Sequence, residues 1–283
     1  VKKRVTTFTN AQLQAVEHKD GPLSIVAVPG AGKTAVLTER LVRLVESGVL
    51  ASEILFATFA NKACDEIRDR VRSFLPEGAE LPEILTLNAL GFKILRENRA
   101  ILGRLRLADD MCRLDLIKEA LNIAPLMQGV SYRAIEGKFG LLRMLDSAFQ
   151  NIDESGVEQY KERHPKIDID GLLKVKSVYD ALYRKGGYIG FDDQITLAVE
   201  LLKTYPSILK KYQEKYRYIM VDEYQDSNLV QELLLKSISG EDEGRFNRFM
   251  VGDVKQSIYK FRLARPELFI EKYTCYTKVD SIR

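Results

Sequence analysis

Short apolar runs alternate along the chain with segments in which apolar residues recur every three or four positions. The runs have the length of buried parallel strands. They lie at residues 24–28, 54–58, 84–87, 218–221 and 249–251. The segments between them show helical spacing, as Ala63, Ile67 and Val71 do after the second run. This alternation predicts an α/β fold with a parallel β-sheet.

The alternation stops in the middle of the chain, where helical patterns stand alone and a polar stretch interrupts them at residues 151–170. A change of pattern of this kind indicates an insertion between two parts of one domain. We therefore expect the first part of the α/β domain at 1–98, a mostly α-helical insertion at 99–188, and the second part at 189–283.

A glycine-bearing loop follows the first apolar run and ends in Gly32, Lys33 and Thr34. Small residues in such a loop allow its backbone N–H groups to curl around a phosphate. Lys33 would reach the β- and γ-phosphates of a nucleotide, and the Thr34 hydroxyl would hold Mg²⁺. Ala27 stands where the strict P-loop pattern has glycine, and the alternative is a tight turn before an ordinary helix.

Two adjacent acids, Asp222 and Glu223, follow the apolar run at 218–221. Packing does not explain such a pair at the end of a strand. Beside a phosphate-binding loop, one carboxylate would hold Mg²⁺ and the other would polarise the attacking water. The alternative is a helix N-terminus, where acids interact favourably with the helix dipole.

Polar and aromatic residues also follow the second run, at the strand end where ligands bind in α/β sheets. Thr58, Phe59 and Asn61 are candidates there, since an aromatic ring can stack on a base beside groups that bind phosphate. The alternative places Phe59 in the core and Asn61 at a helix cap. Near the start of the chain, the Gln12 amide fits the edge of adenine, or it belongs to a surface helix.

The last apolar run leads into a segment that ends at Arg262. Gln256 is a candidate γ-phosphate sensor, because a neutral amide can gain or lose one hydrogen bond on hydrolysis. Tyr259 and Phe261 alternate with basic residues, which favours a stacking surface for single-stranded nucleic acid. The alternative is an amphipathic helix with Phe261 in the core.

Composition narrows the class of protein. The chain has 283 residues, is 46% hydrophobic and carries a net charge of +3, which permits a nucleic-acid partner without demanding one. No apolar run has the length of a membrane span. Three widely separated cysteines are typical of reduced thiols in a cytoplasmic protein. With only two histidines, neither near a cysteine pair, a structural zinc site is not expected.

Five segments together resemble the UvrD/Rep family of superfamily 1 DNA helicases. They are residues 8–16, 27–34, 58–63, 221–228 and 251–262, in matching order along nearly the whole chain. The last two are the most specific, and residues 251–262 are especially similar to the helicase subunits of AddA/RecB-type helicase–nucleases. The resemblance implies a RecA-like P-loop NTPase domain interrupted by the helical insertion. It also implies an ATP-dependent DNA helicase or translocase that uses Mg²⁺ in DNA repair or recombination.

By motif, the resemblance assigns three sets of residues. The catalytic set is Lys33, Asp222, Glu223 and Gln256, with Thr34 and Asp222 as Mg²⁺ ligands. The nucleotide-binding set is Gln12, Ala27, Val28, Pro29, Gly30, Ala31, Gly32, Lys33 and Thr34. The DNA-binding set is Thr58, Phe59, Asn61, Asn88, Tyr259, Phe261 and Arg262. Asn88 stands where many relatives have histidine, which leaves its DNA contact open.

The resemblance further implies single-stranded DNA and duplex junctions as partners, with a nuclease or accessory subunit in the AddA/RecB-like case. The family's second motor domain, with its arginine finger, would lie beyond Arg283, so we expect an N-terminal part of a longer protein. Alone, this part is expected to hydrolyse ATP weakly. The alternative from another class is a nucleic-acid-binding module that uses ATP as a switch, and an RNA partner stays open.

Overall fold

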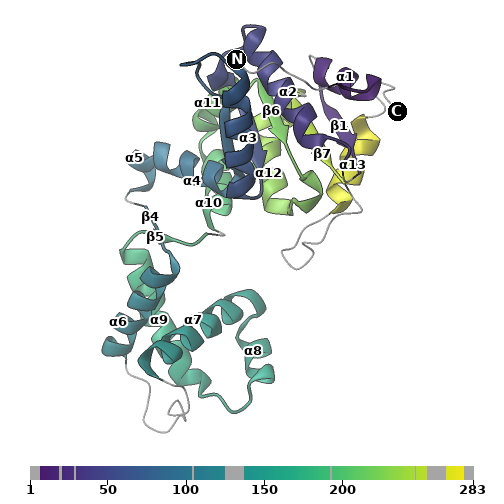
Figure 1. Cartoon of the computed structure of the whole chain (residues 1–283). Helices are drawn as coiled ribbons and strands as arrows, with labels where there is room; N and C mark the ends of the chain where they lie inside the picture. The colour runs from purple at the N-terminus through teal and green to yellow at the C-terminus, as the bar shows by residue number, and fades with distance from the viewer. Residues whose placement is uncertain are drawn as a thin grey trace. The chain divides into compact units, whose positions relative to one another are not determined.

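The computed structural model divides the chain into two compact units (Figure 1). One unit comprises Val1–Leu95 and Gln194–Arg283, and the other comprises Arg96–Asp193. The structure describes residues 7–18, 21–28, 30–103, 105–124, 137–191, 193–245, 247–253 and 266–276. Each unit is treated by itself below.

A five-stranded, all-parallel sheet forms the centre of the first unit, with strand order β1-β7-β6-β2-β3. The strands are β1 (Leu23–Val26), β2 (Ile54–Thr58), β3 (Glu83–Thr86), β6 (Tyr218–Val221) and β7 (Arg248–Gly252). The expected α/β class with a parallel sheet is therefore confirmed. Because the strands run in one direction, their carboxyl ends share one edge, which is where ligands bind in such sheets.

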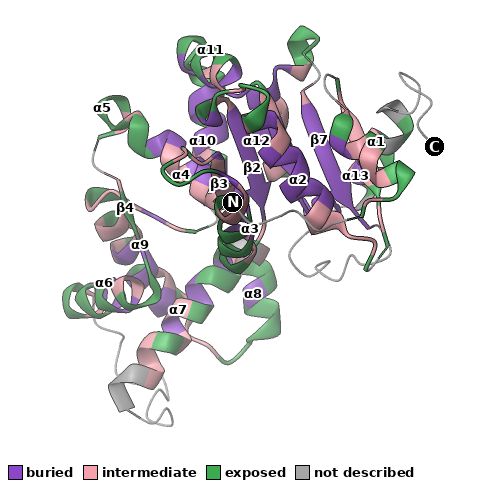
Figure 2. Cartoon of the chain, turned by 45° about the horizontal axis from the view of Figure 1, so that its top comes forward, coloured by how far each residue is buried: buried purple, intermediate pink, exposed green. Residues whose placement is uncertain are grey.

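Helices cover both faces of this sheet (Figures 1 and 2). The described helices are α1 (Asn10–Glu17), α2 (Lys33–Glu46), α3 (Asn61–Phe74), α4 (Leu87–Glu97), α10 (Asp193–Thr204), α11 (Pro206–Lys215), α12 (Leu229–Ser239) and α13 (Pro266–Tyr276), with 3-10 turns η1 (Ala51–Glu53), η3 (Tyr224–Asp226) and η4 (Glu241–Glu243). On one face, α2 and α3 pack against Phe56, Met220 and Phe249. Helices α10, α11 and α12 lie over the other face. Coverage of both faces explains why every residue of β2 and β7 is buried.

The second unit is mostly helical. Its elements are α5 (Arg99–Leu102), β4 (Arg106–Leu107), α6 (Asp110–Ile123), α7 (Gly137–Ser155), α8 (Val157–Arg163), α9 (Ile169–Lys185) and β5 (Tyr188–Ile189). Leu145, Phe149 and Leu172 belong to its separate apolar core. Two features go beyond the sequence pattern. The polar stretch at 151–170 contains the helix α8, and β4 pairs with β5 in parallel where the chain enters and leaves the unit.

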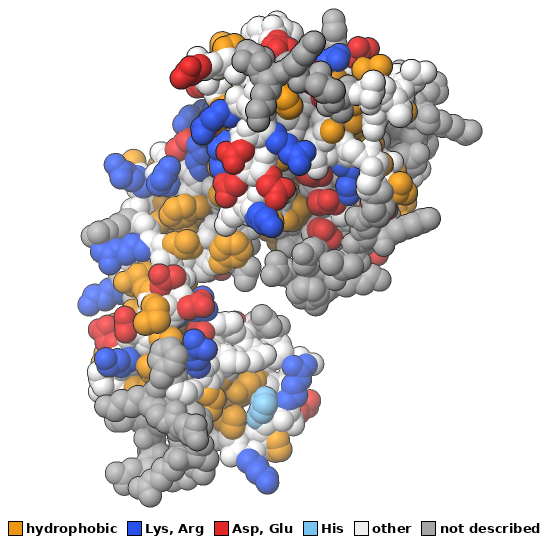
Figure 3. Space-filling model, in the orientation of Figure 1, with side chains coloured by type: hydrophobic (Ala, Val, Ile, Leu, Met, Phe, Trp, Pro, Cys, Tyr) orange, Lys and Arg blue, Asp and Glu red, His pale blue; other side chains and the backbone are white. Residues whose placement is uncertain are grey.

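The surface of the first unit mixes charges of both signs over α3 (Figure 3). The exposed positions of this helix include Lys62, Arg70 and Arg72 together with Asp65 and Asp69. This mixture agrees with the small net charge of +3. Within the described part of the chain, no helix combines the length and the apolar character that a bilayer crossing requires.

Candidate active site

The loop between β1 and α2 has the geometry of an anion cradle. Gly30 and Gly32 both adopt left-handed backbone conformations, with φ angles of 76° and 78°, which glycine tolerates best. Lys33 begins the 14-residue helix α2, whose N-terminus receives no side-chain cap from Gly32. Free N–H groups and the helix dipole therefore point at the same place, a combination that favours phosphate. Pro29 lies outside the described residues.

Gln12 ties the helix α1 to this loop. Thr9 caps α1, and the Gln12 side chain completes the capping box by accepting a 2.8 Å hydrogen bond from the Thr9 backbone N–H. The Gln12 Nε2 group donates to the Ala31 carbonyl oxygen at 2.8 Å. Both ends of the amide are thus engaged within the protein, and its role in reading adenine stays a prediction.

The acidic pair lies at the carboxyl end of β6, beside β2. The Asp222 backbone N–H donates to the Ala57 carbonyl oxygen at 3.1 Å, and Asp222 is only 7% exposed. Its Oδ1 atom accepts a 2.9 Å hydrogen bond from the Glu223 N–H. Glu223 has a φ of 50°, the one positive value at a non-glycine position among the described residues. Such a conformation costs about 1 kcal/mol, and here it turns the chain sharply after the strand.

Lys33 and Glu223, 190 residues apart in the chain, meet at this edge of the sheet. Lys33 Nζ lies 3.0 Å from Glu223 Oε2, and the two side chains are 11% and 38% exposed. The structure therefore brings together the lysine of the loop and the acidic pair, as the sequence analysis requires. A phosphate entering the loop would compete with Glu223 for the same ammonium group.

Asp226 adds a third carboxylate that the sequence analysis did not assign. Burial, followed by the nearby charge of Glu223, raises the pKa of both Asp222 and Asp226 to about 6, while Lys33 acts in the opposite direction. One oxygen of Asp226, Oδ1, is buried without a hydrogen-bond partner. The signal was available in the sequence, because Asp226 follows Asp222 by four residues in the same short string.

The chemistry of this donor set suits a divalent cation, although no three acidic, histidine or cysteine side chains of the described residues converge on one metal position. Asp222 and Asp226 have raised pKa values, and Asp226 Oδ1 is buried without a hydrogen-bond partner. Carboxylate and hydroxyl oxygens are the ligands that Mg²⁺ prefers. Thr34 lies in the first turn of α2, next to Lys33, and would supply the hydroxyl.

A buried ionic cluster supports the turn that carries these acids. Arg248 of β7 is fully buried, and its guanidinium donates to Glu232 Oε2 and to Glu241 Oε1, each at 2.8 Å. Lys272 of α13 lies 2.8 Å from Glu241 Oε2. The Tyr224 hydroxyl donates to Glu232, which links the turn η3 to α12. The cluster thereby joins β7, α12, η4 and α13 behind the site.

The candidate DNA-binding residues divide into three groups. At the end of β2, Thr58 is 2% exposed, whereas Phe59 is half-buried and Asn61 is exposed. Ala60 is the N-cap of α3, so the alternative that placed Asn61 at the helix cap is wrong. Asn88 is half-buried in the first turn of α4, at the same sheet edge. Their contacts with DNA stay a prediction.

The third group falls where the structure gives no description. Gln256, Tyr259, Phe261 and Arg262 all lie outside the described residues, since description stops at Asp253 and resumes at Pro266. Their assigned roles rest on the sequence alone.

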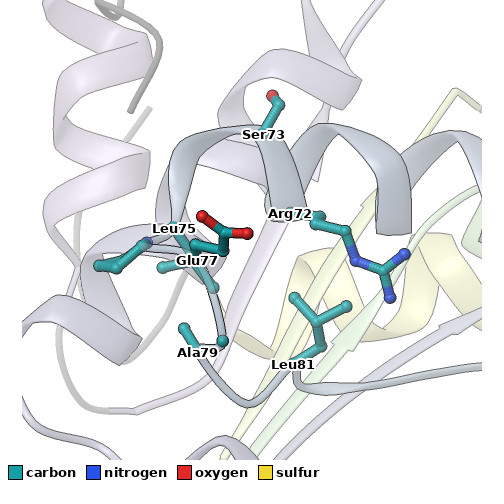
Figure 4. A pocket seen from close by; sticks show the side chains of 8 residues that line it. Arg72, Ser73, Leu75, Glu77, Ala79 and Leu81 are labelled. Carbon is teal, nitrogen blue, oxygen red and sulfur yellow. The ribbon is translucent and has the colours of Figure 1, made fainter.

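A hollow of about 560 Å³ lies elsewhere on the first unit, at the C-terminal end of α3 (Figure 4). Its lining residues are Arg72, Ser73, Leu75, Pro76, Glu77, Gly78, Ala79 and Leu81. None of these belongs to the loop or to the acidic turn. The helix α3 starts at the carboxyl edge of the sheet and runs away from it, so the hollow is separate from the candidate site.

Comparison with known proteins extends over nearly the whole chain. The family described as the UvrD/REP helicase N-terminal domain matches residues 8–277. The chain is 35% identical to the ATP-dependent DNA helicase Rep of Escherichia coli over 263 residues, which cover 90% of this chain and 37% of Rep. It is 34% identical to the ATP-dependent DNA helicase PcrA of Bacillus subtilis over 258 residues, which cover 89% of this chain and 33% of PcrA.

A third relative shows the same extent. The ATP-dependent DNA helicase UvrD1 of Mycobacterium tuberculosis is 33% identical over 261 residues, which cover 89% of this chain and 33% of UvrD1. The chain therefore spans about a third of the length of the relatives it matches.

Proposed function

Because the chain belongs to the UvrD/REP helicase family, we propose that it forms the nucleotide-binding motor domain of an ATP-dependent DNA helicase or translocase. The observation that supports this proposal best is the meeting of Lys33 and Glu223, 3.0 Å apart, at the carboxyl edge of the sheet. A lysine at the head of α2 and an acid at the end of β6 have no packing reason to converge there. Binding and hydrolysis of a nucleoside triphosphate require both groups.

In the proposed reaction, the backbone N–H groups of the loop would bind the phosphates, and Lys33 would leave Glu223 for the β- and γ-phosphate oxygens. Thr34 and Asp222 would hold Mg²⁺, with Asp226 close by; when bound, the ion would neutralise phosphate charge. Glu223, released from Lys33, would orient the attacking water and accept its proton. Glu223 has a left-handed backbone conformation directly after Asp222, and the two acids would serve different purposes.

Coupling of hydrolysis to DNA is the second part of the proposal. The similar proteins Rep, PcrA and UvrD1 are DNA helicases by name. In this chain, Phe59 and Asn61 lie at the same sheet edge as the candidate site and are accessible, so a strand of DNA bound there would be adjacent to the nucleotide. We propose that single-stranded DNA binds across this edge and that nucleotide turnover drives its movement. A helicase–nuclease remains the alternative that a nuclease domain elsewhere in the protein would support.

The test uses the full-length protein that contains this chain. Glu223→Gln is expected to bind ATP with near-normal affinity while kcat falls about 10²- to 10⁴-fold, the range for loss of a general base. Lys33→Met is expected to weaken ATP binding as well. The matched control is Glu66→Gln, at an exposed position of α3, which should leave both quantities unchanged.

Hydrolysis is measured with and without single-stranded DNA. Stimulation by DNA supports a motor, whereas activity that DNA does not change supports a nucleotide-operated switch. Glu223→Gln with unimpaired kcat would overturn the proposed role of this site.

A further inference from the structure

One buried side chain, Gln225, joins the acidic turn to the end of the neighbouring strand. Gln225 lies in η3 and is 1% exposed. Its Nε2 group donates to Glu223 Oε2 at 2.8 Å, and its Oε1 atom accepts from the Asp253 backbone N–H at 2.9 Å. The hydrogen-bond partners therefore fix the orientation of the Gln225 amide. Turning the amide over would place its NH₂ group against the Asp253 N–H and its oxygen against a carboxylate.

The residue at the end of β7 makes room for this link. A Cβ atom added at Gly252 would lie 2.4 Å from Gln225 Oε1 and 3.3 Å from the Gln225 backbone nitrogen. Contacts as short as the first do not occur without a shift of the neighbouring group. Gly252 is not in the left-handed region, so the reason for glycine here is the close approach of Gln225 rather than backbone conformation.

The two donors to Glu223 differ in what a nucleotide would do to them. Glu223 Oε2 accepts from Lys33 at 3.0 Å and from Gln225 at 2.8 Å. In the proposed function, Lys33 moves its interaction to the phosphates. Gln225 stays, because the Asp253 amide anchors its other end. Gln225 is then the donor that keeps the Glu223 carboxylate in place at the moment of reaction.

We propose that Gln225 is a positioning residue that fixes the Glu223 carboxylate and makes its position depend on the end of β7. This inference rests on the proposed function. Asp253 directly precedes residues 254–262, in which the sequence predicts a nucleotide sensor and three DNA contacts. A displacement of the Asp253 amide at the end of β7 on DNA binding would therefore reach Glu223 through Gln225. The same link would act in reverse when the nucleotide site changes.

The test compares two substitutions at Gln225 in the full-length protein. Gln225→Ala removes the hydrogen bonds to Glu223 and Asp226 and the one from the Asp253 N–H. Gln225→Glu keeps an oxygen for the Asp253 N–H but loses the donor to Glu223 and places a like charge beside it. For both variants we expect kcat for ATP in the presence of single-stranded DNA to fall about 10- to 100-fold, as loss of a hydrogen bond to a charged group predicts. The KM for ATP should stay within about threefold, because neither variant alters the phosphate-binding loop.

A variant on the other strand tests the same link independently. Gly252→Ala should displace the Gln225 side chain and lower both kcat and the stimulation by DNA, with Gln225 itself unchanged. The control is Gln231→Ala: Gln231 is a capping-box glutamine of α12 that accepts from the Asn228 N–H at 2.9 Å, and its loss should leave kcat and stimulation unchanged.

The outcomes separate this inference from the proposed function. If the unmodified protein does not hydrolyse ATP, the proposed function fails. If it does, and the Gln225 and Gly252 variants keep normal kcat and normal stimulation by DNA, the inference is wrong. Full rescue by Gln225→Glu would also overturn it, because that result would mean that only the bond to Asp253 matters.

Discussion

Removal of the buried charge of Asp222 should stabilise the nucleotide-free protein while it abolishes the proposed chemistry. Asp222 is 7% exposed, and burial together with the Glu223 charge raises its pKa from 3.8 to about 6. A carboxyl group with a raised pKa in the folded state favours folding when it is protonated. Its contribution is therefore fully present below about pH 4 and is lost as the pH rises through about 6. At pH 7 the folded protein carries an unfavourable buried charge.

The size of the effect follows from the two pKa values of Asp222. The change from 3.8 to about 6 corresponds to about 3 kcal/mol of unfolding free energy at pH 7. At pH 5 the Asp222 carboxyl is mostly protonated in the folded state, and the same linkage leaves about half of that free energy. Asp222→Asn removes the charge but keeps an oxygen that can accept from the Glu223 N–H. We therefore expect the variant to gain about 2–3 kcal/mol at pH 7 and about half as much at pH 5.

The assay is hydrogen exchange of the β6 amides in the 283-residue chain, at several urea concentrations and without divalent cations. This readout follows the first unit alone, so the second unit does not obscure the transition. The control is Asp69→Asn at an exposed position of α3, which should change stability by less than about 0.5 kcal/mol. An Asp222→Asn variant that is no more stable at pH 7, or whose gain does not shrink at pH 5, would refute the reasoning.

Two further substitutions test the support of the site. Arg248→Met leaves the two glutamates of the buried cluster without their main partner and should lower the free energy of unfolding by about 3–5 kcal/mol, measured by urea denaturation; Arg217→Met, at a surface ion pair with Glu53, should cost less than about 1 kcal/mol. Gly32→Ala should weaken nucleotide binding in titrations, because the new Cβ would lie 3.0 Å from Gln12 Nε2 in a left-handed conformation. Gly78→Ala has a similar φ of 81° and open space around it, so it should show the backbone cost without the loss of binding.

The parts of the fold that sequence predicts best are those that a local pattern encodes. The apolar run at 54–58 became the wholly buried strand β2, and the helix after the loop begins at Lys33, because strand length, glycine and helical spacing are all read over a few residues. The sequence pattern did not predict the helix α8, because its seven residues carry little apolar periodicity and only Tyr160 among them is buried. Elements of that kind take their stability from tertiary packing.

Contacts between distant residues set the limit of sequence reasoning at the site. Arg248 is the first residue of an apolar strand, and the sequence pattern alone would place it at the strand's boundary. In the fold, Arg248 is fully buried and pairs with acidic side chains from α12 and η4. Gln225 likewise looks like one polar residue in an acidic string. Its function as a link depends on Gly252, which is 27 positions later and adjacent only because β6 pairs with β7. Functional residues within one motif can be predicted from the sequence. A contact between residues of two motifs can be predicted only when the order of the strands in the sheet is known.

The charge balance of the site gives a reason for nucleotide and cation to bind together. Lys33 pairs with Glu223, while burial and the charge of Glu223 outweigh the opposing effect of Lys33 and raise the pKa values of Asp222 and Asp226. A phosphate that takes Lys33 would leave three carboxylates beside new negative charge, which is unfavourable in a half-buried site. A divalent cation bound without a nucleotide would instead repel the ammonium group of Lys33. In the proposed function, a cation held by the acids would take over the role of Lys33 as their partner while Lys33 binds the phosphate, so each ligand would remove the electrostatic obstacle to the other.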